Sequence, residues 1–371
     1  MESDSRRRAA AVFLAVLFAL VPTSCTALRT DPVPTPADTP AARSQAVLDR
    51  AIAADAPGCS AAVGERGDLL WQGVRGMADL QSRTPISPET SFDVGSVSKQ
   101  FTATAVLLLA SQGKLSTSDP LSKHLEGLSS WSRTVTMGQL MHHVSGIPDY
   151  LGLLAARGIA FEEQTSREQV LKLISEVEFL NFKPGSRWEY SNSNYLLLAM
   201  VIEKISRQRL PEFLQQKIFG PLQLHMVVGS TSSLPGKARS YRVSTGGSGY
   251  QIADWHVYAV GAGGIQSTPS TLVRWADNYS SGRLGGSQLL KAQLKGAEPT
   301  DDVLGHEGSR YGAGIVTDRD GTLWHGGDAG GFHTQFSVLP GRQRALVVAC
   351  NLYDTDASAL SESLTEIWRT R

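Results

Sequence analysis

The chain has 371 residues, with 35 basic and 35 acidic side chains, and 41% of its residues are hydrophobic. This length is enough for a large core and one or two domains. The balanced charge argues against nucleic acid or an anionic membrane surface as the main partner, because both attract a basic protein face.

The first 27 residues are predicted to form a secretory signal peptide. Three arginines at 6–8 precede an unbroken apolar run of 13 residues at 9–21, and this order of charge and hydrophobicity is typical of such signals. A relaxed membrane span needs about 20 residues, so the run is too short for one. We therefore expect an extracytoplasmic protein.

Cys25 is a candidate lipidation site. With the small residues before it, Cys25 resembles a bacterial lipobox, although Pro22 stands where that box has leucine or a similar residue. Ordinary cleavage near Ala27 is the alternative, which would give a secreted protein. Residues 28–45 are rich in proline and predict an extended tether, so any membrane contact would be made through this N-terminal anchor.

The folded domain is expected at 46–371, with strands at both ends. A hairpin is predicted at 58–76, followed by a helix at 101–110 that ends at Gly113. The middle contains a capping box at 165–168, an apolar helix at 195–205 and a helix opened by Thr268 and Pro269. The last elements are strands at 312–316, 334–339 and 344–350 and a helix at 357–368.

This order favours an α+β fold in two lobes. An antiparallel sheet flanked by helices would use about 46–112 and 300–371, and an all-helical lobe would use about 113–299. A cleft between two lobes is where a ligand site is expected.

Cys59 and Cys350 lie in strand-like runs near the two ends of this domain. An exported protein can form disulfides, so the pair could join the first and last strands. Two separate buried side chains are the equal alternative, because free cysteine behaves as a small apolar residue.

Ser96 and Lys99 are the first candidate pair for catalysis. If Ser96 opens a helix, the spacing puts both side chains on one helix face, beside free N–H groups. A lysine screened from water can take the serine proton. Chance spacing is the alternative. Ser111 and Lys114 repeat the pattern at the C-terminal end of the predicted helix, where the helix dipole has the wrong sign for an oxyanion, so position selects Ser96.

Two further motifs offer polar groups. Tyr190 could act as a base or proton relay, and Asn192 offers an amide to a substrate or to Lys99. A plain turn at 190–194 is the alternative. Gly326 and Gly327, which follow His325, would let a substrate approach an edge strand. The N–H of Asp328 could join that of Ser96 at an oxyanion. His325 could bind a substrate carboxylate, and a glycine-rich turn is the alternative.

Other patterns point away from metals and cofactors. His142 and His143 are adjacent, which is not metal-ligand spacing, and we expect no metal and no cofactor. His143, Ser145 and Asp149 are expected to be structural. Trp255 and His256 precede a glycine run and are expected to line a pocket.

The three motifs in this order resemble those of the penicillin-recognising serine hydrolases. That superfamily carries Ser-x-x-Lys, then Tyr-x-Asn or Ser-x-Asn, then Lys-Thr-Gly or His-x-Gly. The versions found here look like the branch of class C β-lactamases, D-Ala-D-Ala peptidases and related esterases. Stretches at 141–149, 261–268 and 327–332 look like the same branch, so the resemblance covers about 46–371.

The resemblance implies a β-lactamase/transpeptidase-like fold with its site between the lobes. It implies that Ser96 is the nucleophile, that Lys99 and Tyr190 share proton transfer, and that Asn192 has a positioning role. Substrate binding would fall to Asn192, His325, Gly327 and Asp328, with the Asp328 N–H completing the oxyanion hole.

One departure bears on the substrate. His325 and Gly326 stand where class C β-lactamases carry the lysine and hydroxyl residue that bind a β-lactam carboxylate. The expected activity is therefore hydrolysis of an ester or amide, such as a D-Ala-D-Ala-type peptide derived from peptidoglycan or a small ester. A weak β-lactamase, an acyltransferase and a penicillin-binding sensor without turnover are the alternatives.

Overall fold

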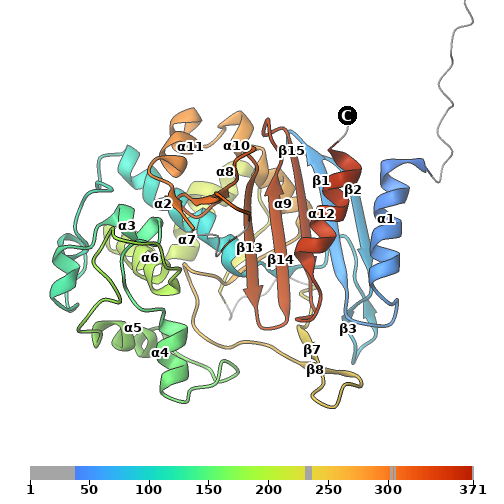
Figure 1. The fold of residues 1–371 in the computed structure, drawn as a ribbon, viewed down its shortest axis with the longest axis horizontal. Coiled ribbons are helices and arrows are strands. Elements are labelled where there is room, and N and C mark those ends of the chain that lie inside the picture. Colours follow the sequence, from blue (N-terminus) through green and yellow to red (C-terminus); the bar gives the residue numbers. More distant parts are fainter. Residues whose placement is uncertain (1–37, 230–235, 301–303, 305, 370–371) are drawn as a thin grey trace, which may run out of the picture. The chain divides into compact units, whose positions relative to one another are not determined.

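The computed structural model describes residues 38–229, 236–300, 304 and 306–369 (Figure 1). The expected signal peptide at 1–27, including Cys25, lies outside them. The extended tether was expected to reach residue 45, but helix α1 (Pro40–Ala51) begins at Pro40. Proline suits the first position of a helix, and the Thr39 side chain caps this one. No helix of the described residues is long and apolar enough to cross a membrane.

Within the described residues, the main sheet has eight antiparallel strands (Figure 1). In spatial order they are β10 (Glu298–Pro299), β11 (Arg310–Tyr311), β12 (Val316–Thr317), β13 (Leu323–Ala329), β14 (Phe332–Val338), β15 (Arg344–Cys350), β1 (Cys59–Glu65) and β2 (Asp68–Arg75). The two ends of the domain meet where β1 pairs with β15 over its whole length. The expected α+β fold, the hairpin and the strand at 344–350 are confirmed.

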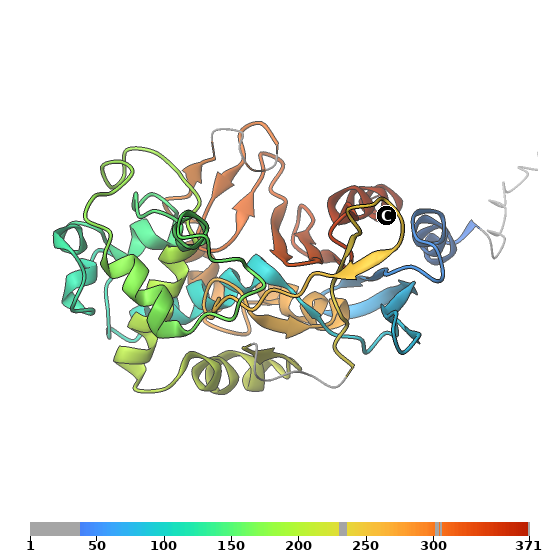
Figure 2. The same ribbon diagram turned by 90° about the horizontal axis from the view of Figure 1, so that it is seen from below.

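Side chains of the central strands alternate between two cores, as the period of a strand requires. On β1, Val63 packs with the core under α1 and α12 (Ala357–Trp368), whereas Ala62 faces the larger core on the other side. On β15, Val348 and Val347 divide in the same way. Figures 1 and 2 show α1 and α12 side by side on one face of the sheet.

Helices and short strands form the rest of the domain. The α-helices are α2 (Lys99–Ser111), α3 (Met137–Met141), α4 (Tyr150–Ala156), α5 (Arg167–Ser175), α6 (Asn192–Ser206), α7 (Leu210–Leu214), α8 (Gly220–Leu222), α9 (Pro269–Ala276), α10 (Asn278–Ser281) and α11 (Gly286–Leu294). The 3₁₀ helices are η2 (Gly95–Ser98), η3 (Leu121–Lys123) and η4 (Ser130–Arg133), and η5 (Gln215–Phe219) is a π-helix. Small sheets join β3 (Met77–Asp79) to β4 (Thr84–Pro85), β9 (Ile265–Ser267) to β5 (Phe92–Asp93) and β6 (Val227–Val228), and β7 (Tyr241–Val243) to β8 (Tyr250–Ile252).

Three further expectations differ from the structure. Residues 312–315 form the turn between β11 and β12 rather than a strand, because Gly314 has a φ of +74° and lies against the backbone of Lys99. The capping box of α5 uses Ser166 and Gln169, one residue later than predicted. Helix α9 falls in the stretch assigned to the helical lobe, yet it packs on β1, β2 and β15 and so covers the sheet.

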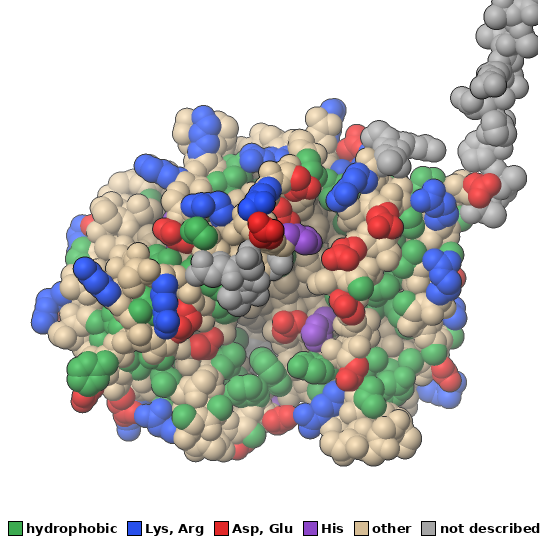
Figure 3. Space-filling model, in the orientation of Figure 1, with side chains coloured by type: hydrophobic (Ala, Val, Ile, Leu, Met, Phe, Trp, Pro, Cys, Tyr) green, Lys and Arg blue, Asp and Glu red, His purple; other side chains and the backbone are tan. Residues whose placement is uncertain are grey.

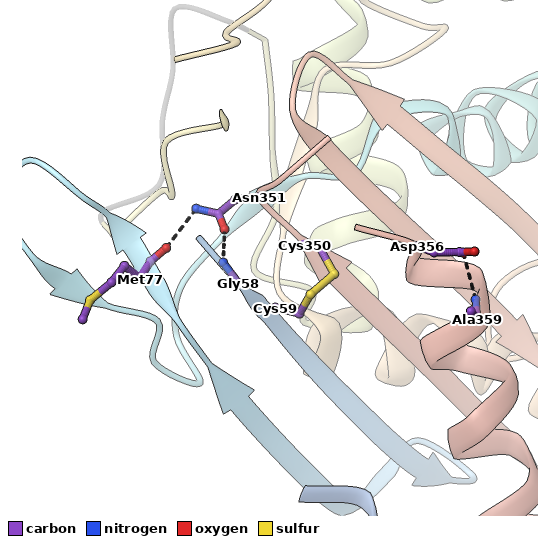
Figure 4. Close-up of a disulfide and its surroundings, with 7 residues drawn as sticks. All are labelled: Gly58, Cys59, Met77, Cys350, Asn351, Asp356 and Ala359. Atoms are coloured by element: carbon purple, nitrogen blue, oxygen red, sulfur yellow. Dashed lines mark hydrogen bonds between the residues drawn. A yellow bond between two sulfur atoms is a disulfide. The ribbon is translucent and has the colours of Figure 1, made fainter. Parts of the chain in front are cut away.

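Cys59 and Cys350 form a disulfide, which settles the alternative left open by the sequence (Figure 4). They face each other across β1 and β15 and are separated by 291 residues in the chain. The next residue, Asn351, extends this junction. Its side chain accepts a hydrogen bond from the Gly58 N–H at 2.7 Å and donates one to the Met77 carbonyl at 3.1 Å (Figure 4).

Removing this disulfide is expected to destabilise the domain. The double variant Cys59→Ala/Cys350→Ala should lose about 2–4 kcal/mol of unfolding free energy, because the bridge restricts a long loop in the unfolded chain. Urea unfolding with and without reductant measures the effect. Reductant should lower the midpoint of the wild type and leave that of the double variant unchanged. Equal midpoints for the oxidised wild type and the double variant would contradict a stabilising bridge.

Candidate active site

Ser96 lies on the turn that leads into the buried helix α2. It belongs to η2, and α2 itself begins at Lys99. The turn requires Gly95, which has a φ of +51° and donates its N–H to the Asp93 carboxylate at 2.9 Å. The chain therefore changes direction at Ser96, and Ser96 lines the cavity described below.

Lys99 is fully buried and contacts three oxygen atoms. Its Nζ lies 2.9 Å from Ser96 Oγ, 2.7 Å from Asn192 Oδ1 and 2.7 Å from the carbonyl of Ala262. Burial lowers the Lys99 pKa from 10.5 to about 7, although the charges of Asp149 and Asp328 act in the opposite direction. A large fraction of Lys99 is thus neutral near pH 7, and its free electron pair can reach the Ser96 proton.

Tyr190 closes the other side of this pair. The Lys99 ammonium lies 4.8 Å from the centre of the Tyr190 ring. Burial raises the Tyr190 pKa well above its usual value, although a hydrogen bond with Ser96 acts in the opposite direction. Tyr190 therefore carries its proton near pH 7, and it can donate this proton beside the Ser96 hydroxyl.

Asn192 connects Lys99 to Asp149. While Asn192 Oδ1 accepts from Lys99, its Nδ2 and backbone N–H donate to Asp149 Oδ2 at 2.7 and 3.1 Å. The other oxygen of Asp149 caps α4 through the N–H of Leu151 at 2.9 Å. Asp149 was expected to be structural. It is a cap, but it also fixes the orientation of the Asn192 amide.

His143 supports the Tyr190 turn from behind. Its ring stacks on the Tyr190 ring with 4.3 Å between centroids. Its Nδ1 accepts hydrogen bonds from the Ser191 N–H and from Asn194 Nδ2, each at 3.1 Å. Burial holds the His143 pKa well below its usual value, so the ring is neutral. The sequence predicted a structural role for His143, and this role is to support Tyr190, a neighbour of Ser96.

His325 lies on β13 and is buried and neutral. Its Nδ1 lies 2.6 Å from the Gly326 carbonyl, and its Nε2 lies 2.8 Å from the Tyr311 hydroxyl. Burial, aided by the charge of Lys99, lowers the His325 pKa to about 4. Because both nitrogens have partners, His325 offers no free positive charge to a substrate carboxylate near pH 7. Tyr311 was missed in the sequence, because no motif marks it.

Gly327 brings β13 against the turn that carries Ser96. A Cβ on Gly327 would lie 2.0 Å from the Val94 carbonyl and 3.2 Å from the Ser96 nitrogen. A Cβ on Gly95 would likewise lie 2.5 Å from the Asp328 nitrogen. The backbones of Ser96 and Asp328 are therefore close neighbours, which is the arrangement that two oxyanion donors need.

Gly327→Ala is expected to separate these backbones and lower activity at least 100-fold, the loss typical of one oxyanion donor. Gly326→Ala is the matched control, since a Cβ there would meet nothing closer than a Gln335 side-chain oxygen at 3.6 Å. Hydrolysis of a p-nitrophenyl ester by the two variants measures the difference. Equal rates in both would show that the close approach is unimportant.

A cavity of about 1010 Å³ opens above these residues. It is lined by Ser96, Tyr190, Asn192, His325 and Asp328, and also by Trp255 and His256, as expected. Figure 3 shows the surface hollowed beside β13. No group of three or more metal-ligating side chains occurs in the described part of the chain. The second pair, Ser111 and Lys114, is exposed at the far end of α2.

The fold and this Ser96–Lys99–Tyr190 constellation define a β-lactamase-related serine hydrolase. The family model described as Beta-lactamase matches residues 44–365, and the chain therefore belongs to this family. A curated relative, penicillin-binding protein 4* of Bacillus subtilis, is 34% identical over 157 residues, which cover 42% of this chain and 34% of that protein. The chain spans less than two thirds of the length of the first curated relatives it matches.

Solved structures share the fold. An octameric penicillin-binding protein homologue from Pyrococcus abyssi has a TM-score of 0.74 at 23% identity, over 85% of this chain and 74% of that one. A D-stereospecific amidohydrolase from Streptomyces sp. has a TM-score of 0.72 at 24% identity, over 87% of this chain and 98% of that one. At these identities the likeness establishes the β-lactamase/transpeptidase fold.

Proposed function

We propose that this protein is an exported serine hydrolase that forms an acyl-enzyme on Ser96 from an ester or amide. The observation that carries the proposal is the buried Lys99 Nζ, which lies 2.9 Å from the Oγ of Ser96, a residue that lines the cavity. A buried amine with a pKa of about 7 is a suitable base for a hydroxyl nucleophile at neutral pH.

The reaction proceeds in two halves. Neutral Lys99 takes the Ser96 proton as Oγ attacks the carbonyl carbon, and the N–H groups of Ser96 and Asp328 hold the oxyanion. Tyr190 donates its proton to the departing group and regains one from Lys99. Water then attacks the ester on Ser96 through the same groups in reverse, which releases the acid and restores the serine.

The surroundings of His325 favour a leaving group without charge. Tyr190 must reach the leaving atom, so the leaving group lies on the Tyr190 side of Ser96, where the Tyr190 and His325 ring centres are 6.5 Å apart. Leu304, Val316 and Trp324 line the cavity and pack in the same apolar cluster as Tyr190. With His325 neutral, these described residues supply no cation for a terminal carboxylate. An amide or neutral ester therefore fits better than a free D-Ala-D-Ala terminus or a β-lactam.

The remaining alternatives follow from the same site. Carboxypeptidase action on a peptidoglycan-derived peptide needs a cation that binds the terminal carboxylate. The described residues on the leaving-group side of Ser96 supply no such cation. An acyltransferase would use the same acyl-enzyme with another acceptor, and a sensor would acylate without turnover. The signal pattern at 1–27 supports export, and Cys25 is the candidate lipid anchor.

A substrate panel separates these activities. The D-stereospecific amidohydrolase with the same fold makes D-configured amides the first choice, so the full-length protein is given an N-acyl-D-Ala amide, the matching N-acyl-D-Ala-D-Ala and a short p-nitrophenyl ester. We expect turnover of the amide and the ester, and at least tenfold slower release from the free-acid peptide. Benzylpenicillin, followed by mass spectrometry, is expected to give neither a lasting adduct nor rapid hydrolysis.

The opposite results would overturn specific parts of the proposal. Preferred release of D-Ala from the free-acid peptide would indicate a carboxypeptidase. A lasting penicillin adduct would indicate a penicillin-binding peptidase or sensor, and hydrolysed drug without an adduct would indicate a β-lactamase. An L-Ala amide serves as the stereochemical control.

A further inference from the structure

Both ends of the segment 325–329 of strand β13 line the cavity. His325 lies at one end, beside Tyr190, and Ala329 lies at the other, four residues or about 13 Å along the strand. Gly327 lies between them and contacts the Ser96 turn. If the leaving group occupies the Tyr190 end, as the proposed function requires, the acyl part of the substrate extends towards Ala329.

Lys237 lies at this acyl end. Ala329 pairs with Phe332 at the start of β14, and the Lys237 Nζ is 5.6 Å from the centre of the Phe332 ring. Lys237 is partly buried and lines the same cavity as Ser96. The aromatic face below the ammonium favours this position for the cation.

The charge of Lys237 has no ion pair among the described residues. The other cations that line the described part of the cavity, Arg209 and Arg239, pair with Glu203 and Asp254 at 3.2 and 3.0 Å. Lys237 forms no such pair within 4.0 Å of a described carboxylate.

The acidic groups at this end have other contacts. The charge of Lys237 lowers the pKa of Asp93, but burial raises this pKa by more. The Asp93 carboxylate also accepts a hydrogen bond from the Gly95 N–H at 2.9 Å. Asp328 pairs with His333 at 3.0 Å and is two thirds exposed. Lys237 thus remains available to a ligand that enters the cavity.

We propose that Lys237 binds a carboxylate on the acyl part of the substrate, a few atoms from the carbonyl that Ser96 attacks. This proposal rests on the proposed function and names the substrate class: an acyl group with an acidic side arm and an uncharged leaving group. The two ends of the site then differ in charge preference, because the cation lies at the acyl end and neutral His325 at the other. A carboxylate on the leaving group would gain nothing from Lys237.

Two p-nitrophenyl esters test this proposal with the full-length protein. One carries a glutaryl group, with its free carboxylate, and the other carries the glutaric monoamide, which has the same size and no charge. We expect kcat/KM to be about tenfold higher for the anionic ester, which is the lower end of the effect of one hydrogen bond to a charged group. Lys237→Gln should abolish this preference, and Lys237→Glu should reverse it.

Controls separate the possible failures. Lys217→Gln, on the exposed side of η5, should keep the preference and excludes a general effect of net charge. The preference should also shrink in 0.5 M salt, because a partly exposed cation is screened. If the wild type hydrolyses both esters equally, or if Lys237→Gln keeps the preference, the proposal is overturned. If the wild type hydrolyses neither ester, the proposed function itself fails.

Discussion

Ser96→Ala is expected to lower kcat by about 10⁵- to 10⁶-fold, the loss seen when a serine nucleophile is removed from a hydrolase. The variant loses the atom that forms the acyl-enzyme, and binding and the oxyanion donors account for any residual rate. Thermal melting should change little, because the substitution removes one hydroxyl from a residue at the cavity wall. Hydrolysis of a p-nitrophenyl ester and mass spectra of the trapped acyl-enzyme measure both effects.

Ser111→Ala is the matched control for this experiment. Ser111 repeats the spacing to a lysine, but its hydroxyl donates to the Leu108 carbonyl at 2.8 Å at the exposed end of α2. The control should keep full activity and the acyl adduct. Full activity in Ser96→Ala, or loss of activity in Ser111→Ala, would contradict the assignment of Ser96 as the nucleophile.

Lys99→Met is expected to lower kcat/KM by about 10⁴-fold, near the upper limit for general acid–base catalysis. In the wild type, the Lys99 pKa is lowered to about 7. The neutral amine is the active form, so kcat/KM should rise as pH increases through about 7 and fall tenfold per pH unit below it. A pH–rate profile from pH 5 to 9 measures this limb.

Tyr190→Phe separates the two proton carriers. Tyr190 keeps its proton in this pH range because burial raises its pKa, so the variant should be slower but retain the rise through about pH 7. If the rise disappears in Tyr190→Phe, the two groups titrate as a coupled pair, and Lys99 is not the base by itself. A flat wild-type profile would contradict a role for Lys99 as the base.

Much of this site could be predicted from local sequence. The choice of Ser96 over Ser111 rested on position relative to the helix, and the structure places the first in the cavity and the second on the surface. The helix at 357–368 and the strand at 344–350 were also predictable, because apolar residues recur at helical spacing in the first and form an unbroken run of strand length in the second.

Protonation states could not be predicted in this way. His325 was considered as a ligand for a carboxylate, a role that needs a cation. Its pKa of about 4 and its contact with Tyr311 instead leave it neutral. Burial determines this property, and burial depends on how β11 and β13 are arranged in the sheet.

The chemical groups, their order and the elements that carry them could be read from the sequence, because local periodicity and short motifs encode these features. Which of these groups contact one another follows from the folded arrangement of the chain. Lys99 contacts a carbonyl 163 residues away, and Cys59 bonds to Cys350 across 291 residues. The contact of Asp149 with Asn192 and the position of Lys237 beside Phe332 are decided in the same way. Such contacts depend on the packing of distant segments, for which no local pattern exists.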